Sequence, residues 1–126
     1  MTFEAFRAAV ESMVEDIPEE FLQGLQGVHV MEEAVPEEDF EEVYRLGEYL
    51  DPGTPNFLGG QAGLGRHIAL YYGSFVAVAD DDFDWEAEIW ETLTHELRHH
   101  VESLAGEDSL VQDDIEKQLR FERRPR

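Results

Sequence analysis

Residues 84–106 read DWEAEIWETLTHELRHHVESLAG, and this stretch has the pattern of one long amphipathic helix. Asp84 is a suitable N-cap, and Gly106 is a suitable C-terminal stop. At 100° per residue, five apolar side chains fall within one sector of the helix surface, which predicts that this side faces the core. These side chains are Trp90, Leu93, Leu97, Val101 and Leu104.

The motif His95-Glu96-x-x-His99 lies within this helix, with both histidines away from the apolar stripe. Histidines four residues apart stand one turn apart on the same face, so their imidazoles can bind one metal ion, typically zinc. The intervening Glu96 is placed to act as general base on a metal-bound water. The alternative interpretation is two ordinary exposed histidines. We expect one catalytic Zn²⁺.

The rest of the chain predicts helices at both ends and short strands between them. In chain order, we expect a first helix with Thr2 as its N-cap that stops at Pro18, a short helix over 18–25, strands over 27–31, 43–50 and 67–79, a loop over 51–65, and a last helix over 109–123. We expect His29, His67 and His100 to be structural. At most one of Tyr71 and Tyr72 can face a cleft and donate to an oxyanion, and aromatic packing on the sheet is the favoured interpretation. The plan is one α+β domain over residues 1–126.

The charge balance is strongly acidic, with 30 Asp and Glu residues against nine Lys and Arg residues, a net charge of −21. Such a field disfavours nucleic acid and anionic membranes as partners. The chain has no cysteine, which excludes disulfides and thiolate metal ligands. It shows neither a signal-peptide pattern nor an apolar run long enough to span a membrane. We therefore expect a cytoplasmic monomer or homodimer.

Residues 94–106, THELRHHVESLAG, resemble the minimal zincin-like metallopeptidases of bacteria. The N-terminal helix and the strand at 68–72 fit the same family. The resemblance implies a short twisted sheet, mixed or mostly antiparallel, packed against the active-site helix, with an edge strand lining a substrate cleft. It also implies that His95 and His99 bind the metal and that Glu96 is the general base. Along the expected edge strand, the substrate-binding residues would be Ile68, Leu70 and Tyr72.

The third metal ligand does not follow from the motif. Related zincins have a glycine three residues after the second histidine, where this chain has Glu102, and its glycine comes later, at Gly106. Asp108 follows that glycine, but four more residues of helix would carry it away from the metal. The methionines are at positions 1, 13 and 31, so a Met-turn below the site is absent.

Three acidic residues are candidates for this third ligand. Asp114 would come level with His99 if the last helix folds back at Gly106. Asp108 fits the order of the motif but not its spacing. Glu102 shares the histidine face, yet it lies seven residues from His95 and suits a hydrogen-bonding role around the ligands better. We favour Asp114, with Asp108 close behind and Glu102 third.

Two classes of function remain open. The first is a zinc-dependent peptidase acting on peptide or protein substrates. The second is a catalytically inactive zincin-fold module that binds a partner or a metal, which the displaced glycine favours. A metal-dependent amidase or deacylase acting on a small molecule is a third, weaker alternative.

Overall fold

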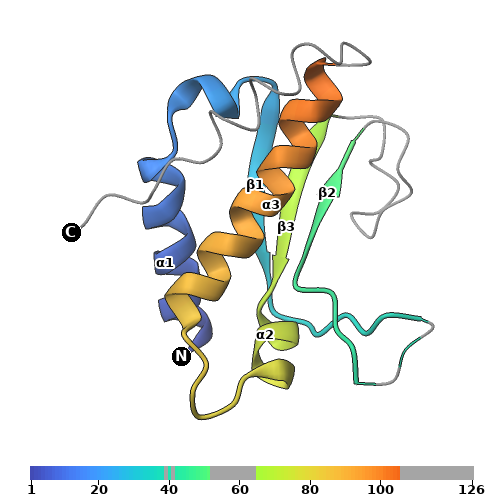
Figure 1. The fold of residues 1–126 in the computed structure, drawn as a ribbon. Coiled ribbons are helices and arrows are strands. Elements are labelled where there is room, and N and C mark those ends of the chain that lie inside the picture. The colour runs from blue at the N-terminus through green and yellow to red at the C-terminus, as the bar shows by residue number, and fades with distance from the viewer. Residues whose placement is uncertain (39, 41, 52–64, 106–126) are drawn as a thin grey trace.

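The computed structural model describes residues 1–38, 40, 42–51 and 65–105, which form a small sheet covered by helices (Figure 1). This confirms the predicted α+β class. The elements in chain order are α1 (Phe3–Asp16), the 3₁₀ helix η1 (Glu19–Leu22), β1 (Leu25–Met31), β2 (Gly47–Leu50), β3 (Arg66–Tyr71), α2 (Tyr72–Val78) and α3 (Trp85–Ala105). None of the helices in this described part combines the length and hydropathy that a membrane span requires.

The sheet is mixed and has the order β1-β3-β2, so β3 is the central strand. β1 runs parallel to β3, with Val28 opposite Ile68, whereas β2 runs antiparallel to β3, with Tyr49 opposite Ile68. The apolar segment Ile68–Tyr71 is buried throughout, which is typical of a strand with neighbours on both sides. The two sheet edges among the described strands are therefore β1 and β2.

The main core lies between one face of the sheet and the helices α1 and α3, which lie beside one another in Figure 1. Each fully buried aliphatic side chain in this layer stabilises the fold by roughly 1.5–3 kcal/mol. The core residues with no exposed surface are Phe6, Met13, Ile68, Leu70, Phe75, Ile89, Leu93 and Leu97.

The buried face of α3 differs in part from the predicted stripe. Leu93 and Leu97 are buried as predicted, but Leu104 is 46% exposed. Glu96 and His100 are buried instead, at 8% and 0% exposed. The face is rotated because β2 packs on that side of α3 and its polar groups satisfy these two side chains.

Both predicted helix N-caps are confirmed. The amide of Ala5 donates to Thr2 Oγ1 over 3.1 Å, and the amide of Ala87 donates to Asp84 Oδ1 over 3.2 Å. Each bond satisfies one of the free amides of a first helical turn. The predicted helix over 109–123 and most of the predicted loop lie outside the described residues.

The predicted strand over 67–79 is wrong beyond Tyr71, where the chain turns into α2. At Gly73 a Cβ atom would come within 2.5–2.8 Å of the backbone at residues 32–34, and the Gly73 amide donates to Glu32 O over 3.1 Å. Ser74 Oγ accepts the Val35 amide over 2.8 Å, and Phe75 is buried. These long-range contacts override the strand preference of the local sequence.

Candidate metal centre and cleft

His95 and His99 project together from the exposed face of α3. Their Nε2 atoms lie 3.2 Å apart, with the two rings perpendicular at a centroid distance of 4.8 Å. Two nitrogen ligands of a tetrahedral zinc, each about 2.0–2.1 Å from the metal, would lie about 3.3–3.4 Å apart. The histidine pair is thus close to the spacing that one zinc ion requires, and a single shared proton is the alternative occupant of that position.

Glu96 lies on the inner side of the same helical turn and is 8% exposed. Its carboxylate is hydrogen-bonded to the backbone of Tyr49 on β2. Burial raises the pKa of Glu96 above its ordinary value, and the nearby Glu48 acts in the same direction. His95, His99 and the hydrogen bond from Tyr49 oppose this shift without reversing it.

His100 fixes the position of the metal-binding turn from the opposite side of α3. Its Nε2–H donates to Gln23 O over 2.8 Å, so Nδ1 is free to accept the Tyr49 hydroxyl over 3.0 Å. Burial lowers the pKa of His100, which favours this neutral state. The prediction of a hydrogen-bonded structural histidine is confirmed.

A cleft runs between α3 and β2 past the histidine pair. Two cavities of about 640 and 360 Å³ form it, and they share Arg45, Gly47 and Glu96 in their walls. His99 lines the larger cavity and His95 the smaller one. A third cavity of about 560 Å³ lies along α1 and β1 and contains neither histidine. The cleft is therefore the cavity that can bring a ligand to the candidate metal.

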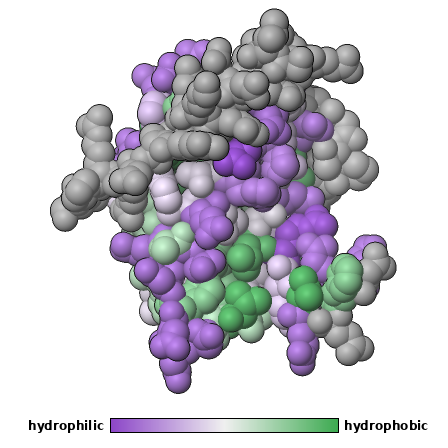
Figure 2. Space-filling view, in the orientation of Figure 1, coloured by the Kyte–Doolittle hydropathy of each residue, from purple (hydrophilic) through white to green (hydrophobic). Residues whose placement is uncertain are grey.

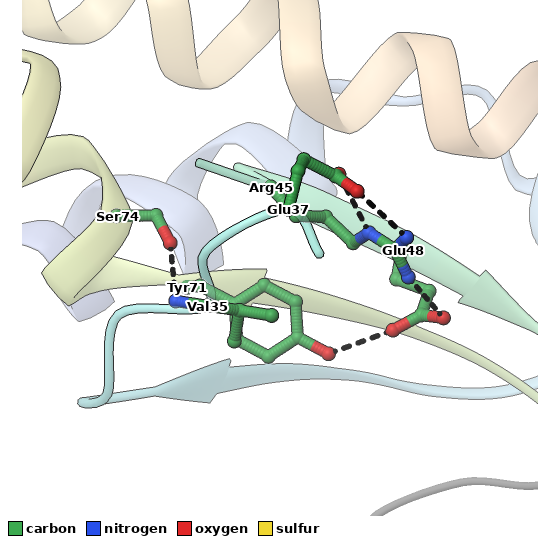
Figure 3. Close-up of polar contacts among 6 residues, drawn as sticks. All are labelled: Val35, Glu37, Arg45, Glu48, Tyr71 and Ser74. Atoms are coloured by element: carbon green, nitrogen blue, oxygen red, sulfur yellow. Dashed lines mark hydrogen bonds and ion pairs between the residues drawn. The ribbon is translucent and has the colours of Figure 1, made fainter. Parts of the chain in front are cut away.

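Arg45 sits where the two cavities meet and is anchored by carboxylates (Figure 3). Its guanidinium makes two hydrogen bonds to Glu37, of 3.0 and 3.1 Å, and one of 2.9 Å to Glu48. The bonds to Arg45 hold the pKa of Glu37 below its usual range. The Tyr71 hydroxyl donates to the second oxygen of Glu48 over 2.9 Å, and burial raises the pKa of Tyr71.

The expectation about the edge strand is wrong. The strand containing Ile68 and Leu70 is central and both side chains are fully buried, while Tyr72 belongs to α2, so the edge strand beside α3 is β2. Neither Tyr71 nor Tyr72 is among the residues that line the cleft. Tyr71 is buried and its hydroxyl donates to Glu48, and the Tyr72 hydroxyl donates to Met1 O. Strand pairing is non-local, so the order of strands could not be read from their spacing.

The sequence reasoning missed the cleft residues Arg45, Glu48 and Tyr49. These residues belong to no recognisable motif. The sequence indicated only that they fall within the predicted strand over 43–50.

The third metal ligand stays a prediction. Asp114 and Asp108 lie outside the described residues. Glu102 lines the same cavity as His99, one turn further along α3. Within the described part of the chain, however, no three His, Asp or Glu side chains come together as a metal-binding group.

Comparison with known proteins shows the family of this chain. The family model described as zincin-like metallopeptidase matches residues 25–118, and the chain belongs to that family. A solved structure of a conserved hypothetical protein from Thermus thermophilus is similar to this chain, with 65% sequence identity and a TM-score of 0.75. The match covers 85% of this chain and all of that one. No curated protein matches the sequence.

Proposed function

We propose that this protein is a zinc-dependent metallopeptidase whose active site is the cleft between α3 and β2. The observation that carries the proposal is the pair of facing Nε2 atoms of His95 and His99, 3.2 Å apart, with Glu96 in the wall of the same cleft. Both imidazoles would bind the metal in their neutral form through Nε2, which leaves Nδ1–H as a donor. When bound, zinc supplies a Lewis acid that activates water and polarises a carbonyl.

Glu96 would move the proton in this reaction. Its carboxylate would take a proton from the water that attacks the scissile carbonyl and would then deliver it to the departing amine. The pKa of Glu96 is raised by burial, which makes it a stronger base than an exposed glutamate. The hydrogen bond to the Tyr49 backbone holds the carboxylate against β2.

An extended substrate would lie along β2. Among the described strands, β2 pairs with β3 alone, and its residues Gly47, Glu48 and Tyr49 line the cleft. An edge strand offers backbone donors and acceptors to a peptide that binds as an additional strand. β2 thus takes the place that the sequence had suggested for residues 68–72.

A zincin-fold module without catalysis is the second candidate. It is favoured by the displaced glycine of the motif, and no group of three or more candidate metal ligands is present among the described residues. A two-histidine site binds zinc more weakly than a catalytic site with three protein ligands.

Zinc content and cleavage of a peptide library together test the proposal. Purified wild type should retain one zinc per chain after dialysis and cleave peptides, and His95→Ala should lose both properties. Glu96→Gln should keep the zinc and lose cleavage, because amide nitrogen and oxygen cannot accept the proton. Zinc without cleavage in the wild type would support the module, and cleavage that persists in Glu96→Gln would contradict the proposed base.

A further inference from the structure

Unpaired carboxylates flank the histidine pair on both sides along α3. Glu88 and Glu91 line the smaller cavity with His95, and Glu102 lines the larger one with His99. At 100° per residue all five side chains fall within about 80° of one another, so they form one ridge along the cleft. No ion pair involves these three glutamates within the described part of the chain.

The cleft has little positive charge to offset this ridge. Arg45 is the one Lys or Arg side chain among the described residues that line it. Three of its five N–H groups are committed to Glu37 and Glu48, whose two carboxylates outnumber its single charge. On the side of the molecule that displays α3 and β2, the described surface combines many hydrophilic residues with a hydrophobic patch in its lower half (Figure 2). Among the described residues that line the cleft, acidic side chains therefore outnumber basic ones.

The spacing of the ridge matches an extended chain. With a rise of about 1.5 Å per helical residue, Glu91 and Glu88 lie about 6 and 10 Å before His95, and Glu102 lies about 4.5 Å beyond His99. An extended peptide advances about 3.3 Å per residue. The carboxylates therefore stand about two to three residues from the histidine pair in one direction and about one to two residues in the other.

We propose that this cleft selects extended peptide segments with Lys or Arg side chains on both sides of the bond at the metal, and that Glu88, Glu91 and Glu102 are the residues that select them. This inference rests on the proposed function, because it places the scissile bond at the histidine pair. An acidic substrate segment would meet like charge along the whole cleft.

Cleavage of three internally quenched peptides tests the selectivity. The peptides share their central residues and carry flanks of Lys, Gln or Glu. The zinc-loaded wild type should cleave the Lys peptide with a kcat/KM about tenfold above that of the Gln peptide, and the Glu peptide more slowly still. Glu88→Gln/Glu91→Gln and Glu102→Gln should each reduce the Lys preference by about threefold. High salt should reduce it in the wild type.

Glu11→Gln is the matched control, because it removes the same charge from the exposed face of α1, outside the cleft. Equal rates on the Lys and Gln peptides, or equal losses in the control and the cleft variants, would overturn the inference. If the wild type cleaves no peptide, the proposed function fails. Fluorescence anisotropy of the same peptides on zinc-loaded Glu96→Gln then tests the selectivity separately from cleavage. Lys-selective binding that is weakened by adding Glu88→Gln/Glu91→Gln would still support the inference, and equal binding of the Lys and Gln peptides would overturn it.

Discussion

The Tyr49 hydroxyl donates to Nδ1 of the fully buried His100 over 3.0 Å, and this bond ties the edge strand β2 to the helix that carries the metal-binding motif. The backbone of the same tyrosine bonds to Glu96. One residue of β2 therefore positions both the candidate general base and the neighbouring turn of α3. The spacing between the cleft walls depends on it.

Tyr49→Phe should destabilise the protein by about 1–3 kcal/mol, because it leaves the buried Nδ1 of His100 without a donor. Urea denaturation measures this loss. Tyr44→Phe is the control, since Tyr44 is partly exposed and no hydrogen bond of its hydroxyl is described; its expected effect is within about 0.5 kcal/mol. Equal effects of the two changes would contradict a structural role for the Tyr49 hydroxyl.

The metal-binding face of the candidate site could be predicted from the sequence, because it depends only on the spacing of residues within one helix. A His-Glu-x-x-His spacing on a capped helix places His95 and His99 on one face whatever the helix packs against. The identity of the edge strand could not be predicted, since it depends on which strands pair. The burial of Glu96 and its raised pKa could not be predicted either, because they depend on β2, which lies about 50 residues earlier in the chain.

The turn from β3 into α2 could not be predicted from the local sequence either. The run from Ile68 to Ala79 has the composition of a single strand, and the close approach of residues 32–34 to Gly73 is one of the long-range contacts that end it. Gly73→Ala should destabilise the protein by about 1–3 kcal/mol, because the new methyl group would clash with backbone that cannot rotate away.

Gly27→Ala provides the comparison for this change in thermal or urea denaturation. Its Cβ would meet the His29 ring, a movable side chain, at 3.3 Å. The loss should therefore be smaller than at Gly73. A harmless Gly73→Ala would mean that α2 does not pack against residues 32–34 as described.

The contact between His29 and His67 predicts a pH dependence of stability. His29 Nε2 and His67 Nδ1 are 2.9 Å apart. Burial, and then the charge of His67, lowers the pKa of His29 below its ordinary 6.5. The unfolded chain therefore binds this proton at a higher pH than the folded chain does. The contribution of neutral His29 to stability is full above pH 6.5 and is lost as the pH falls toward the folded pKa.

The free energy of unfolding, measured in urea between pH 7.5 and 5.5, checks this prediction. His29→Gln should give a shallower fall on acidification than the wild type, because it removes the titrating group. The difference between the two profiles separates the contribution of His29 from that of Glu96. The raised pKa of Glu96 makes its contribution to stability increase as the pH falls, opposite to that of His29. Parallel profiles would contradict the assignment.

The third metal ligand can be identified by removing one carboxylate charge at a time. Asp114→Asn, Asp108→Asn and Glu102→Gln preserve side-chain size, so a large loss of zinc affinity marks a ligand rather than a packing residue. We expect Asp114→Asn to weaken zinc binding the most, and Glu102→Gln to weaken it by about 10- to 100-fold, as for a residue that only orients the ligands. Competition against a zinc-binding dye measures the zinc affinity of each variant. The affinity of His95→Ala shows how much is lost when one ligand is removed. If Glu102→Gln matches His95→Ala while both aspartate variants match the wild type, α3 alone supplies all three protein ligands.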